Sequence, residues 1–129
     1  MKEIKRLPDA ELAVMQEIWN AEERPVPSAY ICGRVCEPHG WKQTSVLTFL
    51  SRLCEKGFLK QEKQGKMNAY TPLLDAETYR AQAGAHFLRR LYRGSVRDLV
   101  ASLTDAGELT DADLDELRAF LDEKGREDG

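Results

Sequence analysis

The stretch between residues 43 and 56 restricts the fold more than any other part of the chain. Apolar residues recur there at the spacing of one helix face, and Gly57 follows as a helix-ending residue. Lys56 would complement the dipole at the end of such a helix. One side is therefore expected to pack and the other to face a partner. The packing face holds Val46, Leu50, Leu53 and Cys54, with Leu47 at its edge, and the other face holds Trp41, Ser45, Thr48 and Arg52.

A β-hairpin pattern follows this helix directly. Residues 58–64 and 67–72 alternate imperfectly between apolar and polar side chains, and the polar turn at Gly65 and Lys66 lies between them. Three lysines give this hairpin a basic character, which favours contact with an anionic partner. They are Lys60, Lys63 and Lys66.

Two further helices are expected upstream. The first begins after Asp9, its expected N-cap, and ends near Asn20, and the second covers about residues 29–36 and is capped by Ser28. Two prolines separate them and prevent a continuous helix. Three helices followed by a hairpin predict a mainly α protein whose residues 1–73 form a winged helix-turn-helix, with the hairpin as its wing. The expected core is Leu12, Met15, Trp19, Ile31, Val35, Val46, Leu50, Leu53, Leu59 and Tyr70.

Residues 74–129 are expected to be helical only. An apolar stripe runs over about four turns up to Gly94, a short helix covers about 96–103, and a capping-box pattern at residues 110–113 opens a last helix with a frayed tail from Gly125. Residues 74–129 contain too few large apolar side chains to close a core alone. This region is therefore predicted to be a dimerisation module that a second copy of the chain completes. The predicted dimer contacts are Tyr79, Ala83, Phe87, Leu91, Leu117 and Phe120.

Charge is segregated along the chain, although the net charge is only −3. Residues 41–72 carry six basic and two acidic side chains, whereas residues 98–129 carry three basic and eleven acidic ones. The local field around the hairpin, rather than the average, is what a phosphate backbone would meet. No apolar run is long enough to span a bilayer or to act as a signal peptide, so a cytoplasmic protein without membrane insertion is expected.

The middle of the chain fits double-stranded DNA as its partner. A helix fits the major groove, where hydroxyl, amide and guanidinium groups read base edges, and a basic wing meets phosphates. Two alternatives remain open: a solvated helix face, or a winged-helix module that binds a protein. The DNA-binding candidates are Lys42, Gln43, Thr44, Ser45, Thr48, Arg52, Lys63 and Lys66.

Other chemistry is less well supported. Cys32, Cys36 and His39 have a short metal-ligand spacing, but a fourth ligand would have to come from afar, and two small buried residues beside a turn histidine are favoured. Neither histidine belongs to a catalytic arrangement, and no glycine-rich phosphate loop is present. We therefore expect no enzyme activity, no metal and no cofactor.

Three motifs resemble the penicillinase-repressor family. They are residues 7–15 (LPDAELAVM), 45–53 (SVLTFLSRL) and 55–59 (EKGFL), and the similarity covers about residues 7–124. The resemblance implies a homodimeric transcriptional repressor on an inverted-repeat operator, often of β-lactam resistance genes. It also implies a membrane sensor-protease that releases the repressor by cleavage in the dimerisation module. The matching bond here joins Ser102 and Leu103.

The chain also departs from the family pattern on the expected recognition helix. Ser45 replaces a usual threonine, Lys42 stands where a capping serine is common, and Thr44 and Leu47 occupy positions that often hold Lys or Arg. These departures affect the operator sequence rather than the mode of docking. The cysteine-rich C-terminal motif of the family's copper-responsive branch is missing, since no cysteine follows Cys54. Direct copper sensing is therefore not expected.

Overall fold

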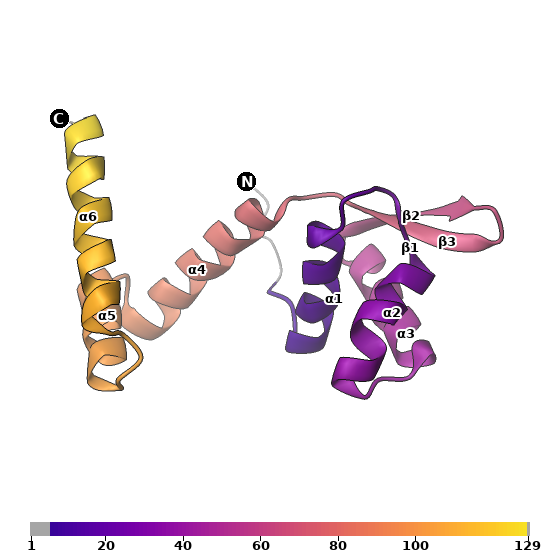
Figure 1. The fold of residues 1–129 in the computed structure, drawn as a ribbon, viewed down its shortest axis with the longest axis horizontal. Coiled ribbons are helices and arrows are strands. Elements are labelled where there is room, and N and C mark those ends of the chain that lie inside the picture. Colours follow the sequence, from indigo (N-terminus) through magenta and orange to yellow (C-terminus); the bar gives the residue numbers. More distant parts are fainter. Residues whose placement is uncertain (1–5, 129) are drawn as a thin grey trace. The chain divides into compact units, whose positions relative to one another are not determined.

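The computed structural model describes residues 6–128 and forms two compact units, residues 1–83 and residues 84–129, which divide within one helix. We call them the N-terminal and C-terminal units. The functional boundary predicted after residue 73 stays a prediction. In chain order the elements are α1 (Asp9–Asn20), β1 (Val26–Pro27), α2 (Ser28–His39), α3 (Gln43–Glu55), β2 (Leu59–Gln64), β3 (Met67–Pro72), α4 (Ala76–Tyr92), α5 (Val96–Asp105) and α6 (Asp111–Asp128) (Figure 1).

The N-terminal unit combines three helices with a small antiparallel sheet. The strand order is β1-β3-β2, so β3 is central and β2–β3 form the predicted hairpin, which is confirmed (Figure 1). Val26 lies opposite Tyr70, and Leu59 lies opposite Pro72. Strand β1 was not predicted, because two residues that include a proline show no alternation.

The core of this unit is close to the predicted one. Eight of the ten predicted residues are buried, while Leu12 and Trp19 are only partly buried. Phe58 and Tyr79 join the core from outside the predicted set, and their rings meet edge to face with centroids 5.8 Å apart. The buried apolar residues are Leu7, Val14, Met15, Ile18, Val26, Ile31, Val35, Val46, Leu50, Leu53, Phe58, Leu59, Ala69, Tyr70 and Tyr79.

The predicted starts of α1 and α2 are wrong by one residue each. Pro8 and Pro27 hold the N-cap positions, and neither helix has a side-chain cap there. Asp9 is thus inside the first turn of α1, where a carboxylate still favours the helix dipole. Helix α2 also continues beyond the predicted Cys36 to His39, although it contains a proline in its last turn. It ends at Gly40, whose positive φ of 67° suits a glycine at the end of a helix.

Helices α5 and α6 begin with side-chain caps. Ser95 Oγ accepts from the Asp98 amide at 3.1 Å. The predicted capping box of α6 is confirmed: the Thr110 amide donates to Asp113 Oδ2 at 2.9 Å, and the Asp113 amide donates to Thr110 Oγ1 at 3.1 Å. The frayed tail predicted from Gly125 is wrong, since α6 continues to Asp128.

Candidate nucleic-acid interface

Helix α3 is fixed by its packing face and leaves a polar face open. Val46, Leu50 and Leu53 are completely buried in the core of the N-terminal unit. This anchoring turns the opposite side of the helix outward at positions spaced three and four apart. We call this set the exposed stripe of α3; its residues are Thr44, Leu47, Thr48, Ser51 and Arg52.

Most of the predicted DNA-binding residues of this segment are exposed. Lys42 is the N-cap of α3, and it and Gln43 lie open at the start of the helix. Ser45 is partly buried, so it offers less surface to a partner than predicted. Leu47, expected at the edge of the packing face, is instead exposed, and exposed Ser51 was not predicted, although the helical spacing of both from Thr44 and Thr48 was visible in the sequence.

Trp41 was assigned to the open face of the helix, and that assignment is wrong. Its indole is partly buried against the core, stacked on His39 at 4.2 Å and edge-on to Phe49 at 5.2 Å between ring centroids. Trp41 lies before α3 begins, so the helical angle used to place it does not apply. The three rings instead hold the turn between α2 and α3.

The wing carries its lysines on both faces. Side chains alternate along a strand, so Lys63 shares the hairpin face of buried Leu59, whereas Lys60 lies on the opposite face. Lys66 lies in the turn between β2 and β3, and all three lysines are exposed. Lys63 and Lys66 remain the predicted phosphate contacts.

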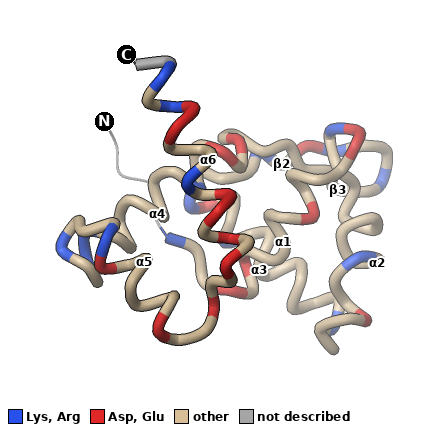
Figure 2. The backbone as a smooth tube through the Cα atoms, turned by 60° about the vertical axis from the view of Figure 1, so that its left-hand side comes forward, with Lys and Arg blue, Asp and Glu red and all other residues tan. Residues whose placement is uncertain are grey.

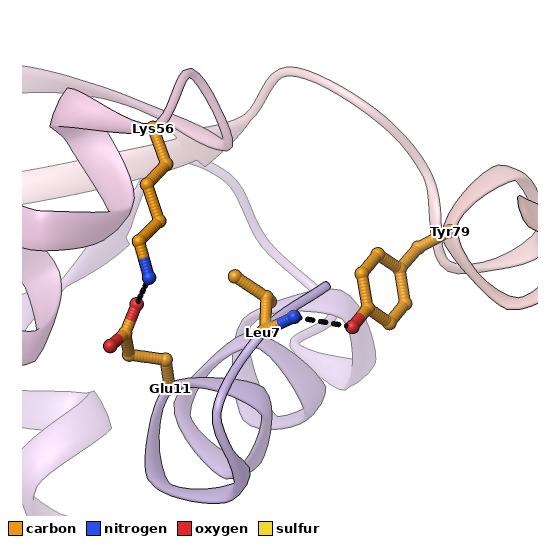
Figure 3. A network of polar contacts seen from close by, with 4 residues as sticks. All are labelled: Leu7, Glu11, Lys56 and Tyr79. Carbon is orange, nitrogen blue, oxygen red and sulfur yellow. Dashed lines mark hydrogen bonds and ion pairs between the residues drawn. The ribbon is translucent and has the colours of Figure 1, made fainter. Parts of the chain in front are cut away.

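An ion pair holds α1 to the end of α3. Lys56 Nζ donates to Glu11 Oε1 at 2.5 Å, and the Glu11 side chain is only 4% exposed (Figure 3). The charge of Lys56 is therefore used inside the protein and is not offered to a phosphate. Sequence analysis missed this pair because the two residues lie 45 positions apart.

The first turn of α4 is tied to the N-terminal unit. The Leu7 amide donates to the Tyr79 hydroxyl at 2.8 Å (Figure 3), and the Trp19 indole N–H donates to the Leu74 carbonyl at 3.0 Å. Tyr79 is only 4% exposed, and Ala83 also packs against this core. Both were predicted as dimer contacts. The Tyr79 side chain is already covered within the chain and offers little surface to a second copy, whereas Ala83 is only partly buried and stays a predicted contact.

The other four predicted dimer contacts lie in the C-terminal unit and are exposed. Phe87 is 39% exposed and Leu91 62%. Between residues 84 and 126, no side chain is fully buried. Acidic positions recur along α6 (Figure 2). The exposed large apolar residues of this unit are Phe87, Leu91, Val96, Leu117, Phe120 and Leu121.

The predicted cleavage bond lies inside α5. Ser102 is exposed and Leu103 is partly buried. The Ala106 amide donates to the Ser102 carbonyl at 3.0 Å, so the bond is part of a formed helical turn. A protease that binds extended substrates would have to unwind this turn first.

The cysteines are free and partly buried. Burial raises the pKa of the Cys32 thiol, and neighbouring Cys36 raises it further; burial also raises the pKa of Cys54. Thiols with raised pKa values are poor nucleophiles and poor metal ligands near neutral pH. Among residues 6–126, no three His, Cys, Asp or Glu side chains gather as a metal site.

Comparison with known proteins decides the family. The penicillinase repressor family model matches residues 7–123. The chain belongs to the penicillinase repressor family. This is a family of transcriptional repressors, so the expectation that the chain is not an enzyme is confirmed.

Two curated relatives of this family member cover almost its full length. The penicillinase repressor of Bacillus licheniformis is 30% identical over 123 residues, which are 95% of this chain and 94% of that one. The methicillin resistance regulatory protein MecI of Staphylococcus aureus is 25% identical over 115 residues, or 89% and 92%.

Solved structures match about three fifths of this family member. The DNA-binding domain of the repressor BlaI aligns with a TM-score of 0.52 and 33% identity, covering 61% of this chain and 94% of that one. Monomeric Bacillus licheniformis BlaI in complex with the blaP half-operator gives a TM-score of 0.51 at the same identity and coverage. The predicted winged-helix fold is thus confirmed. Over residues 6–128, no helix is long and apolar enough to cross a membrane.

Proposed function

We propose that this chain is a transcriptional repressor that binds an inverted-repeat operator as a homodimer, through α3 in the major groove and the wing on the phosphates. The observation that supports this most is the exposed stripe of α3, a mostly polar row on a helix whose opposite side buries Val46, Leu50 and Leu53 completely. The relative solved with a half-operator has the same winged-helix fold. Lys42, Gln43, Thr44, Ser45, Thr48, Arg52, Lys63 and Lys66 are the proposed DNA contacts.

Salt dependence separates this function from a winged-helix module that binds a protein. Each phosphate neutralised by Lys or Arg adds about −0.9 to the slope of log affinity against log salt concentration. We expect a steep slope when duplex binding is followed by fluorescence anisotropy between low and physiological salt. A protein interface with an apolar centre would show a shallow slope. No measurable duplex binding at low salt would refute the proposed function.

The dimer is supported by what the C-terminal unit lacks. A helical unit without a buried side chain between residues 84 and 126 does not gain enough apolar burial to offset the entropy of ordering it. A second copy that covers Phe87, Leu91, Leu117 and Phe120 would supply that burial.

Phe87→Asp tests this dimer without touching the N-terminal unit. A buried carboxylate at the interface should give monomers in sedimentation velocity and much weaker operator binding. Leu73→Asp is the matched control, because Leu73 is 58% exposed and precedes α4. A Phe87→Asp variant that sediments as a dimer would refute this interface.

We further propose that cleavage between Ser102 and Leu103, by a membrane sensor-protease, releases the repressor. The dimer engages two half-sites in one binding event, so the loss of α6 would remove the benefit of effective concentration and lower affinity by about 10²–10⁴. Because Leu103 is partly buried and the bond lies within a helix, we expect α5 to unwind locally before the bond is cut. Because operator DNA is the proposed partner, we place this regulation in the cytoplasm.

Mass mapping of the repressor after incubation in extracts of induced cells tests the cleavage. Fragments ending at Ser102 are expected. An intact chain that nevertheless leaves its operator on induction would rule out the proteolytic switch.

A further inference from the structure

The centre of the exposed stripe of α3 is apolar, although its two ends are polar. The structure describes every residue of α3, and Leu47, at 36% exposed, is the one large hydrophobic residue of this helix that is exposed. Thr44 and Ser51 flank it along the stripe at three and four positions. The Leu47 side chain therefore lies between residues of the stripe that are proposed to contact base edges.

Thr48, beside Leu47, has no free hydroxyl proton for a base. Its Oγ1 donates to the Thr44 carbonyl of its own helix at 3.1 Å. A threonine hydroxyl has one proton, so only its lone pairs and its methyl group remain for a partner. The exposed Thr48 side chain therefore adds a second apolar group to that of Leu47.

Two apolar groups at the centre of a DNA-facing helix match one feature of the major groove. Thymine carries a 5-methyl group there, and no other unmodified base does. We propose that Leu47 and the Thr48 methyl form a subsite for thymine 5-methyl groups, and that this subsite sets the operator preference of the chain. This inference rests on the proposed function. Polar recognition is then left to Gln43 and Thr44 at one end and to Ser51 and Arg52 at the other.

Uracil substitution tests the subsite directly. The full-length protein first selects duplexes from a random library, and each thymine of the selected site is then replaced by deoxyuridine, which removes only the methyl group. Anisotropy should show about a fourfold loss of affinity at one or two thymines in each half-site, the factor expected for one buried methyl-sized group. Leu47→Ala should lose this dependence at the same thymines, while Leu73→Ala, an exposed leucine outside α3, should keep it.

Two substitutions at Thr48 separate its methyl from its hydroxyl. Thr48→Val keeps the methyl and should keep both affinity and the response to uracil. Thr48→Ser keeps the hydroxyl, and it should weaken that response. The opposite order would show that the hydroxyl reads the base and would overturn the role given to Thr48.

The outcomes distinguish this inference from the function on which it rests. A wild-type chain that enriches no sequence overturns both. A chain that enriches a site but is indifferent to uracil at every thymine overturns the methyl subsite alone. Equal uracil responses in wild type and Leu47→Ala also overturn it, because the methyl contact would then come from another residue.

Discussion

Replacing Lys56 by methionine tests the polar link between α1 and the end of α3. The Glu11 side chain is 4% exposed and that of Lys56 is 24% exposed, so the two ends of this pair are not equivalent. Lys56→Met leaves a buried carboxylate without its cation, which should cost about 3 kcal/mol, the lower end for breaking a buried pair. Glu11→Gln keeps an acceptor for a lysine that can also reach solvent, and should cost about 1 kcal/mol.

Urea unfolding followed by tryptophan fluorescence measures this difference. Both tryptophans, Trp19 and Trp41, lie in the N-terminal unit, so the signal reports that unit alone. A loss of about 3 kcal/mol moves the midpoint by about 1–3 M for an ordinary slope. The double variant Glu11→Leu with Lys56→Met should recover most of the loss, because an apolar pair can replace a buried ion pair. Equal losses in both single variants, or no recovery in the double variant, would refute the reasoning.

Three further predictions concern the interface and the helix ends. Arg52→Ala should lower specific operator affinity by about 1–3 kcal/mol, whereas Lys66→Ala should weaken all duplexes alike and flatten the salt slope by about one unit; the reverse pattern would exchange their roles. Tyr79→Phe should cost about 1–3 kcal/mol in urea by leaving the Leu7 amide unpaired, and should leave sedimentation unchanged; a weakened dimer would contradict the position of Tyr79. Hydrogen bonds from Thr110 hold the pKa of Asp113 below its ordinary 3.8. The stabilisation that the Asp113 carboxylate gives α6 is therefore complete above pH 3.8 and is lost as the pH falls through the lowered pKa. A pKa of 3.8 or higher for Asp113 in a carboxyl NMR titration would contradict this.

Local patterns were sufficient to predict most of the N-terminal unit. Helical spacing placed α3 within one residue of its observed end, and the turn at Gly65 placed both strands of the wing. The capping box of α6 was also visible, because its two members lie three residues apart. Each of these signals is contained within a few residues.

The features that were missed depend on distant parts of the chain or on which residue takes the N-cap position of a helix. Glu11 and Lys56 belong to separate motifs, and only the packing of α1 on α3 brings them together. Tyr79 fits the apolar stripe of α4 equally well as a dimer contact, and its burial follows from Leu7 and Phe58. At the starts of α1 and α2, Asp9 and Ser28 looked like caps, but the preceding prolines hold those positions.

The bond between Leu7 and Tyr79 spans 72 positions, and that between Trp19 and Leu74 spans 55. A chain leaves the ribosome from its N-terminus, so α1 is synthesised long before the residues that complete its surroundings. During that interval Leu7 lacks its acceptor and Phe58 lacks its edge-on ring. The newly made N-terminal unit thus stays incomplete until the first turn of α4 has emerged, and during that interval its unfinished core is exposed to chaperones and proteases.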